Sequence, residues 1–366
     1  MFVRDNRGSF ADGRVCALAM FGSDTQAPAH PKILEAIVAA NDGRAGSYGA
    51  DEWSAKALAA VQHIFETDDL DMYLVGTGGA ANGLALSLLC PPWGAVLAHG
   101  AAHVLADEGS GPEHFTSGAR MISVGGGHSM LIASDLDRVA QQFSCHNVHA
   151  AQPRAVTLTN LSENGLAYSV DQIGALSEVC RANQLSLHMD GARFANALVA
   201  KGACPGDVTW RAGVDALSFG LTKNGGACAE ALIVFGASRN IAAPYLRKRS
   251  GHLFSKQRYM AAQFVAMLEN DLWLELAACA NTKARQLESV LRDNGCRIVF
   301  SVDGNQVFAQ MSSPQHQALV QTGIDCYPWP AAGQDVFRFV SCWQTDSQDI
   351  AHVQMALASV KHAGLS

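Results

Sequence analysis

The chain has 366 residues, of which 49% are hydrophobic and only 16% are charged, and its net charge is −7. This length predicts two domains, and the low charge content fits a globular chain whose strands are covered on both faces or whose surface is partly buried between subunits. The acidic balance and an isoelectric point near 6.0 argue against nucleic acid or an anionic membrane as the principal partner. The low charge content leads us to expect a homo-oligomer.

Ten cysteines are scattered from Cys16 to Cys342, without a CxxC pair or the spacing of a metal site. We interpret them as reduced core residues and expect no metal. No signal peptide is recognisable, which together with the cysteines predicts a cytoplasmic protein. The longest charge-free stretch, Met72 to Ala106, is interrupted by Pro91-Pro92-Trp93-Gly94. It therefore predicts a helix, a turn and a strand, with no membrane span.

The N-terminal residues 1–25 lack strong periodicity and predict an arm or extended segment. Ser23 and Asp24, at the end of this segment, are both candidate caps of a helix or turn. His30-Pro31 then opens a helix that reaches Ala40, because proline suits the first helical turn. A loop that contains Tyr48 follows, and an amphipathic helix is expected over residues 54–65.

A glycine-rich turn, Gly76-Thr77-Gly78-Gly79, separates a strand at residues 72–75 from a helix at residues 80–89. A strand, a glycine turn and a helix N-terminus together form an anion site, since free backbone N–H groups and the positive end of the helix dipole face the anion. A dinucleotide could occupy the same pattern. However, GxGxxG is absent, and no acidic residue follows about 20 positions later at a strand end.

Strands and helices then alternate up to residue 235, which predicts an α/β fold with a mainly parallel sheet. The expected strands cover residues 95–98, 121–124, 155–159, 185–190, 216–219 and 232–235, and the expected helices cover 136–143 and 171–183. Three of the loop histidines of this region are considered as site residues. His103 follows the first of these strands, and His146 and His149 precede the strand at 155–159. A lone loop histidine is more often structural than catalytic.

Asp190 and Lys223 form the most informative pair of residues. Asp190 ends an apolar run, at the strand edge where open α/β sheets bind ligands, and Lys223 follows the next strand in a loop of small residues, 33 positions later. This spacing leaves room for one helix and one strand, so that both side chains can reach one crevice. A lysine amine can form a Schiff base with pyridoxal phosphate, which also needs an acid opposite its pyridine nitrogen.

The C-terminal part predicts a second domain with a long helical segment at residues 256–293. Strands are expected at 296–302, 306–309 and 336–341. Arg338 stands in the middle of the last of these strands, where a charge needs a partner or solvent. A substrate carboxylate would suit it, because the guanidinium fork matches a carboxylate with two hydrogen bonds.

Seven segments, spread from residue 21 to residue 343, resemble the low-specificity L-threonine aldolases, a family of pyridoxal-phosphate enzymes that includes phenylserine-cleaving types. The segments are FGSDTQAP, AGSYGADE, VGTGGAANGLAL, AAHVLADE, HMDGARFANALV, LSFGLTKNG and DVFRFVSCW. The resemblance implies fold type I of the aspartate aminotransferase superfamily. It further implies an N-terminal arm (1–25), a large cofactor-binding domain (26–245) with a seven-stranded sheet, and a small α+β domain (246–366).

The resemblance also implies roles for the cofactor-binding residues. Lys223 holds pyridoxal 5'-phosphate, Asp190 faces its pyridine nitrogen, and His103 stacks on its ring. Gly78, Gly79 and Thr222 bind the phosphate, although the family usually has threonine at the position of Gly79. Thr77 and Thr222 are the candidates to replace that hydroxyl.

For the substrate, the resemblance assigns Ser23 to the carboxylate and makes Tyr48 an active-site tyrosine. His149 matches the second active-site histidine, so that His103 and His149 are both candidate bases. Arg193 has two open roles, at the phenolic oxygen of the cofactor or at the substrate carboxylate. Residues 158–165 read LTNLSENG where many members have an ENTH-type motif, so this wall of the pocket departs from the family.

The implied reaction is the reversible cleavage of L-threonine, L-allo-threonine and related L-β-hydroxy-α-amino acids to glycine and an aldehyde. The implied assembly is a dimer or tetramer with shared active sites. Two alternatives remain open at the level of sequence, a β-eliminating lyase on the same fold and a catalytically silent relative that only binds the cofactor. Both Lys223 and Asp190 are present, which argues against the silent relative.

Overall fold

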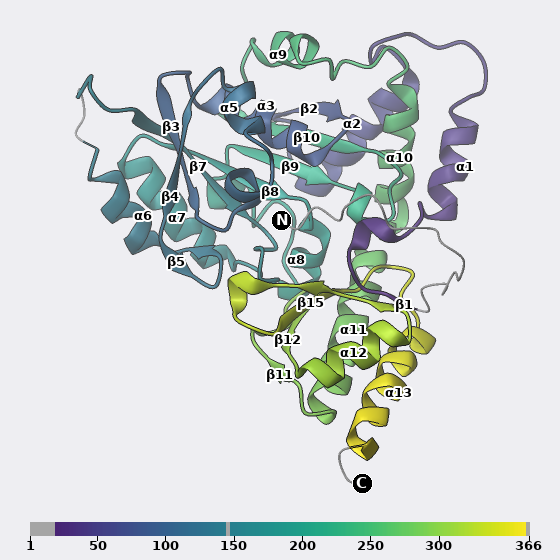
Figure 1. Ribbon diagram of the computed structural model, residues 1–366. Helices are drawn as coiled ribbons and strands as arrows, with labels where there is room; N and C mark the ends of the chain where they lie inside the picture. Colours follow the sequence, from purple (N-terminus) through teal and green to yellow (C-terminus); the bar gives the residue numbers. More distant parts are fainter. Residues whose placement is uncertain (1–18, 144–146, 364–366) are drawn as a thin grey trace.

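A seven-stranded sheet forms the centre of the larger part of the molecule (Figure 1). The structure is a computed structural model and describes residues 19–143 and 147–363. The strand order is β2-β10-β9-β8-β7-β3-β4, with β10 antiparallel to both neighbours and all other pairs parallel. The predicted fold class is confirmed. The strands are β2 (Leu70–Val75), β3 (Gly94–His99), β4 (Arg120–Val124), β7 (Gln152–Thr159), β8 (Ser186–Gly191), β9 (Ala216–Gly220) and β10 (Glu230–Phe235).

Both faces of this sheet are buried, and β10 shows why a strand in this position is apolar from its second residue onward. Ala231, Ile233 and Phe235 belong to the main core, whereas Leu232 and Val234 belong to a core on the opposite face. Alternate residues of a strand point to opposite faces, so a strand between two layers of helices needs apolar residues at every position. The helices that contribute to the main core are α2 (Glu52–Phe65), α6 (Ala133–Ala140), α7 (Val170–Ala182) and α8 (Phe194–Lys201). The helices that contribute to the other cores are α3 (Gly78–Leu89), α4 (His103–Ala106), α5 (Gly111–Phe115) and α9 (Ala243–Arg249).

Local capping residues set several helix starts. Asp51 accepts a hydrogen bond from the Ser54 amide at the start of α2, and Ser169 forms a capping box with Gln172 at the start of α7. The helix α1 (Pro31–Ala39) begins at proline with His30 as its cap. These starts agree with the predicted helices to within three residues.

The predicted long helix over residues 256–293 is interrupted in the structure. α10 (Arg258–Leu268) and α11 (Leu272–Asp293) are separated by a 3₁₀ turn in which Asn270 and Asp271 adopt left-handed φ angles of 53° and 55°. Asn and Asp tolerate this conformation better than most side chains. The continuous apolar periodicity of the segment concealed the break.

A second, antiparallel sheet forms the smaller part of the molecule, in the order β11-β12-β15-β14. Its strands are β11 (Arg297–Ile298), β12 (Gln306–Gln310), β14 (Tyr327–Pro328) and β15 (Val336–Val340), and α12 (Ser313–Gln321) and α13 (Ser347–Ala363) lie beside it. Near the N-terminus, β1 (Ala19–Met20) pairs with β13 (Ile324–Asp325). The described end of the predicted arm is thus a strand of the smaller part, while residues 1–18, with Cys16, lie outside the described residues, as does His146.

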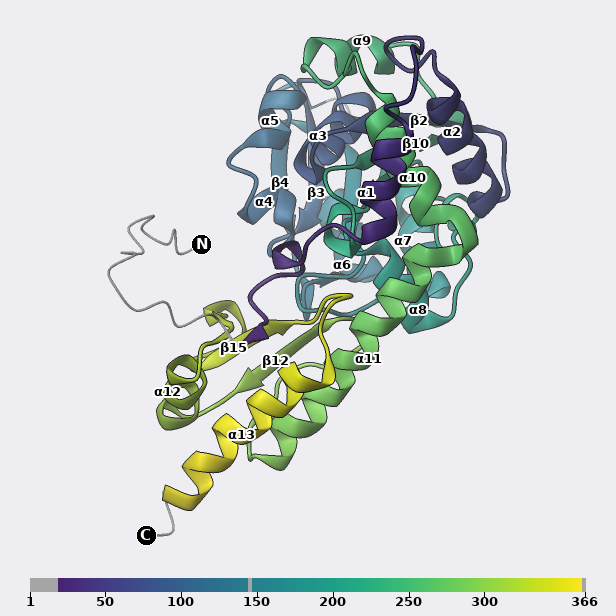
Figure 2. The ribbon, with the colours of Figure 1, turned by 90° about the vertical axis from the view of Figure 1, so that its right-hand side faces the viewer.

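The helix α11 connects the two parts (Figure 2). The main core includes its residues up to Ala277, and the core of the smaller part begins at Ala284 and also takes in Ala19 and Phe21. The predicted domain limits at residues 25 and 245 stay a prediction. No helix of the described residues is both long and apolar enough to cross a membrane.

We expect Phe219→Ala to lower the free energy of unfolding by about 3–5 kcal/mol, because a buried phenyl ring is replaced by a cavity. Phe219 is fully buried on β9 and forms T-shaped, edge-to-face contacts with the rings of Phe65, Phe194, Phe264 and Trp273. Urea unfolding followed by tryptophan fluorescence measures the change. The exposed Ile241→Ala serves as control, and equal stability of the two variants would contradict the expectation.

Candidate active site

The carboxyl ends of β7, β8 and β9 meet at one edge of the seven-stranded sheet. Parallel pairing sets Thr159 of β7 opposite Asp190 of β8, and Asp190 opposite Ser218 of β9. Lys223 lies in the turn that follows β9. The structure therefore brings Asp190 and Lys223 to the same edge, as their positions at strand ends predict.

Asp190 is part of a series of hydrogen-bonded polar groups. Its buried carboxylate accepts a hydrogen bond from the Ala192 amide and another from Asn82 Nδ2, both at 3.0 Å. Asn82 Nδ2 also donates to Glu108 Oε1 at 2.8 Å, and His103 Nδ1 lies 2.9 Å from the same oxygen. The hydrogen bond with Glu108 raises the pKa of His103. These bonds fix the Asp190 carboxylate and the His103 ring relative to each other.

The turn that carries Lys223 is anchored on both sides. Asn224 Nδ2 donates to the Trp273 carbonyl at 2.7 Å, and the Gly225 carbonyl accepts from the His30 amide at 2.8 Å. Gly225 has a φ of 100°, which a residue with a side chain would adopt only under strain. Hydrogen bonds on both sides therefore hold the short turn that carries Lys223 in place.

The strand, glycine turn and helix N-terminus of the predicted anion site follow one another at the start of α3. Thr77 caps the helix, its Oγ1 accepting from the Ala80 amide at 3.2 Å. Among the described residues, no group accepts a hydrogen bond from the amides of Gly78 or Gly79. Two free N–H groups at a helix N-terminus are suited to bind an anion.

Glu230 lies between this turn and the lysine turn. Its Oε1 accepts from the Thr222 amide at 3.3 Å, and an added Cβ on Gly220 would come within 2.7 Å of its Oε2. Burial raises the pKa of Glu230 to about 7. A larger residue at position 220 would therefore displace this carboxyl from its present position.

Arg193 and Asp24 form a buried ion pair. Nε and Nη2 of Arg193 donate to the two carboxylate oxygens of Asp24 at 2.7 and 3.0 Å, and Asn305 Nδ2 donates to Asp24 at 3.1 Å. Burial alone would raise the pKa of Asp24, but the charges of Arg193 and Lys223 and these hydrogen bonds lower it. The sequence suggested two roles for Arg193 toward ligands and gave Asp24 only as a cap. In the structure one edge of the guanidinium is already occupied by Asp24.

Arg338 reaches this region from β15. Its guanidinium lies over the ring of Trp329, at 4.7 Å from the centroid, and Nη2 donates to the Gly22 carbonyl at 3.2 Å. Its Nε is buried and has no hydrogen-bond partner among the described residues. Burial lowers the pKa of Arg338 to about 10. A partly buried cation with a buried, unsatisfied donor is open to an anionic ligand.

Ser23 and Tyr48, the other two predicted substrate contacts, have structural neighbours of their own. Ser23 caps the 3₁₀ turn Asp24–Gln26, as one of its two interpretations predicts. It directly precedes Asp24, so it lies close to the ion pair. Tyr48 is half exposed in the loop before α2, with its ring 5.0 Å from Lys248 Nζ. None of its hydrogen bonds or ring contacts joins it to the other predicted site residues in the described part of the chain.

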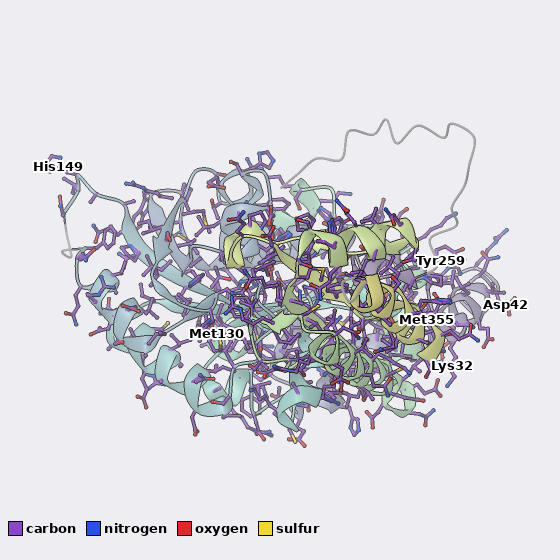
Figure 3. The ribbon with its side chains drawn as sticks, turned by 60° about the horizontal axis from the view of Figure 1, so that its bottom comes forward. Lys32, Asp42, Met130, His149, Tyr259 and Met355 are labelled. Carbon is purple, nitrogen blue, oxygen red and sulfur yellow. The ribbon has the colours of Figure 1, made fainter. Side chains whose placement is uncertain are left out.

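The structure does not bring His149 to this edge of the sheet, contrary to its predicted position. His149 is exposed and precedes the N-terminal end of β7, whereas Thr159 at the other end of that strand lies beside Asp190. Eight strand residues span about 26 Å. Figure 3 shows His149 at the outer tip of its loop. The sequence matched its position to the family but could not show which end of the strand faces the site.

Sequence reasoning missed the site's four buried or partly buried acids. Each contacts or interacts electrostatically with a predicted site residue: Asp24, Glu108, Glu163 and Glu230. Glu108 ends AAHVLADE and Asp24 lies in FGSDTQAP, two of the segments that carry the resemblance, whereas Glu163 lies in LTNLSENG, where the chain departs from the family. Nothing local in the sequence marked Asp24 or Glu230 as neighbours of Lys223.

Comparisons with known proteins show similarity to one family of lyases and to threonine aldolases in particular. Residues 21–314 match the beta-eliminating lyase family. The chain is 36% identical to the low specificity L-threonine aldolase of a Pseudomonas strain, over 94% of this chain and 98% of the relative. The corresponding enzyme of Pseudomonas aeruginosa is 37% identical, over 90% and 94%. Among solved structures, the threonine aldolase of Leishmania major superposes with a TM-score of 0.86 at 26% identity, over 94% and 99% of the two chains.

We expect Asp24→Asn to lower the free energy of unfolding by about 3–5 kcal/mol, because it leaves the charge of buried Arg193 without a partner. Urea unfolding at pH 7 measures the change, with the exposed Asp42→Asn as control. The effect also depends on pH. The folded-state pKa of Asp24 is lowered, so its contribution is present above the unfolded value near 3.9 and is lost as the pH falls through the folded-state value. A wild-type and variant difference that persists unchanged at low pH would contradict this assignment.

Proposed function

The chain belongs to the beta-eliminating lyase family, among the low-specificity L-threonine aldolases, and on this premise we propose how it works. It is a pyridoxal-phosphate-dependent aldehyde-lyase that splits L-threonine, L-allo-threonine and related L-β-hydroxy-α-amino acids reversibly into glycine and an aldehyde. One observation carries the proposal for the site. A lysine and a buried, hydrogen-bonded aspartate lie at one sheet edge, beside free helix N-terminal amides.

The residues at this edge fit the cofactor. The amides of Gly78 and Gly79 would receive its phosphate, assisted by Thr222 or Thr77. Lys223 would hold its aldehyde carbon, and His103 would stack on its ring. Asp190 is kept in place by Asn82 and the Ala192 amide and would face the pyridine nitrogen. When bound, the cofactor withdraws electrons from a bond at the substrate Cα.

The substrate would be oriented by the cations at the interface of the two sheets. Arg338 has a buried, unsatisfied Nε, and the α-carboxylate of an amino acid would satisfy it. Arg193 would contribute with the edge that Asp24 leaves free, and Ser23 lies next to that pair. Tyr48 would act on the substrate only if its exposed loop approached the site. His149 would have to come from a second copy of the chain.

The role of His103 follows from its hydrogen bond with Glu108. Nδ1 is bound to Glu108, so Nε2 is the ring nitrogen available to a proton of the substrate or of water. The raised pKa keeps more of the imidazole protonated near neutral pH. His103 is therefore suited to donate or pass on a proton as well as to stack.

We propose further that the enzyme acts in the cytoplasm as a homo-oligomer of two or four subunits with shared sites. Its free thiols support a reducing environment. Cys90, Cys180 and Cys326 are free and buried, and burial raises their pKa values to about 11 or 12, so they are neutral. The exposed Tyr48 and Tyr245 and the low content of charge support contact between subunits.

We expect the purified protein with pyridoxal phosphate to release glycine and an aldehyde from threonine, allo-threonine and phenylserine. The anchoring groups address the shared carboxylate, so tolerance at the β-substituent should be loose. An aromatic group that becomes buried gains about 1–3 kcal/mol, which would raise kcat/KM for phenylserine over threonine. Glycine is quantified by amino-acid analysis. Ammonia and a keto acid without glycine would instead identify a β-eliminating lyase.

We expect Lys223→Ala to lose covalent attachment of the cofactor, since no other lysine is available in the turn. Borohydride reduction of the wild type should fix the cofactor to the peptide that contains Lys223, as detected by mass spectrometry. Turnover should fall by several orders of magnitude. Lys201→Ala, which removes a partly exposed lysine paired with Asp303, serves as control. A trapped adduct of unchanged yield in Lys223→Ala would remove Lys223 from this role.

A further inference from the structure

Glu163 occupies a turn that several contacts hold in one conformation. The turn follows β7 and is closed by a hydrogen bond from the Ser162 amide to the Leu166 carbonyl at 2.9 Å. The amide of Asn164 donates to Ser129 Oγ at 2.9 Å. Gly165 has a φ of 79°, and an added Cβ there would come within 3.0 Å of the Gln306 side chain. The turn is thus fixed between the end of β7 and the start of β12, beside the site.

Five titratable side chains interact electrostatically with the carboxyl of Glu163. They are His103, Asp190, Arg193, Lys223 and Arg338. Within the described part of the chain, no group donates a hydrogen bond to this carboxyl. Glu163 is only partly buried, so its carboxyl is accessible to a hydrogen-bond donor on the ligand.

We propose that Glu163 is the catalytic base that accepts the proton of the substrate β-hydroxyl. The inference rests on the aldolase activity proposed above, and it deepens that proposal by assigning a residue to the proton transfer. A β-hydroxy amino acid whose carboxylate is bound by Arg338 presents its hydroxyl as the free donor. Glu163 interacts electrostatically both with Arg338, which would bind the substrate carboxylate, and with Lys223, which would hold the cofactor.

Two physical arguments favour Glu163 over His103 in this step. Burial raises the pKa of Glu163, and a carboxylate with a raised pKa is a stronger base than an ordinary one. The hydrogen bond with Glu108 raises the pKa of His103, which leaves less of the neutral imidazole to accept a proton. In addition, His149 is remote from the site in this chain.

The proton and electron count of the step is balanced. The proton of the β-hydroxyl moves to a carboxylate oxygen of Glu163, and the O–H electron pair becomes the second bond of the aldehyde C=O. The Cα–Cβ bond breaks, and its electron pair remains with Cα. The glycine carbon then takes up one proton from solvent, and Glu163 returns its proton to solvent. No oxidant or reductant is needed.

The test compares Glu163→Gln with the wild type and with Glu178→Gln, an exposed change on α7. Glutamine keeps the size but cannot accept the proton. We expect kcat for phenylserine and threonine cleavage to fall by about 10²–10⁴-fold, the usual contribution of a general base. Glu163→Asp should recover part of the loss, and Glu178→Gln should match the wild type. Exchange of the glycine Cα hydrogen with deuterated solvent needs no β-hydroxyl, so Glu163→Gln should retain it within several-fold.

A second readout uses the protein without cofactor. Because the folded-state pKa of Glu163 is raised, the folded state binds its proton more tightly than the unfolded state. Relative to Glu163→Gln, the free energy of unfolding of the wild type should therefore fall as the pH rises from about 4 through the folded-state pKa. His103, Asp190, Arg193, Lys223 and Arg338 face the same carboxyl but are present in both proteins, so the difference curve isolates Glu163.

The outcomes separate this inference from the proposed function. If the wild type releases no glycine from any β-hydroxy amino acid, the aldolase proposal fails. If the wild type does so and Glu163→Gln keeps its rate, only the assignment of Glu163 fails. Equal losses of cleavage and of glycine exchange would also overturn it, since they would indicate a structural role. Parallel stability curves over pH would contradict the raised proton affinity on which the step depends.

Discussion

Three buried strands, β7, β8 and β9, run parallel, so Thr159, Asp190 and the turn with Lys223 meet at one edge of the sheet. His188 links the same strands from inside, with Nδ1 2.8 Å from Thr157 Oγ1 and Nε2 3.0 Å from Ser218 Oγ. Burial lowers the pKa of His188 to about 4, so this ring is neutral and adds no charge beside Asp190. Slipping one strand by a single residue would break these bonds and turn its apolar side chains to the wrong face. The register that builds the core therefore also positions the site.

The charged side chains at this edge come from both parts of the molecule. Arg193 is neutralised by Asp24, which belongs to the segment after β1, and Arg338 arrives from β15 of the second sheet. β1 itself pairs with β13 of the smaller part. Buried charges are tolerated only when they are paired or hydrogen-bonded. The ion pair between Asp24 and Arg193 therefore fastens the N-terminal segment to the large sheet and leaves Arg338 as the cation with an unsatisfied donor.

The sequence predicted the features that depend on neighbouring residues and missed those that depend on residues far apart in the chain. Strand ends and a glycine turn are local signals, so the edge that joins Asp190, Lys223 and the Gly78 amides followed from periodicity and spacing. The pair between Asp24 and Arg193 joins residues 169 positions apart, and no local pattern encodes such a contact. The position of His149 in this chain is a related case. A loop histidine next to a strand is matched by sequence alone, but the direction of the strand decides which end of the sheet it reaches. The break at Asn270 was hidden because the apolar period continues across it.

The buried acid Glu230 lies between two turns that favour opposite charges. Glu230 lies between the amides of α3, which attract an anion, and Lys223, which is a cation. A fully ionised carboxylate there would repel a phosphate at Gly78. Burial raises the pKa of Glu230 to about 7, so the carboxyl is mainly protonated below that pH and mainly ionised above it. Burial therefore outweighs the hydrogen bonds from Thr222 and the charge of Lys223, which lower this pKa. Because a protonated Glu230 adds no negative charge beside the start of α3, the amides of Gly78 and Gly79 keep their attraction for an anion.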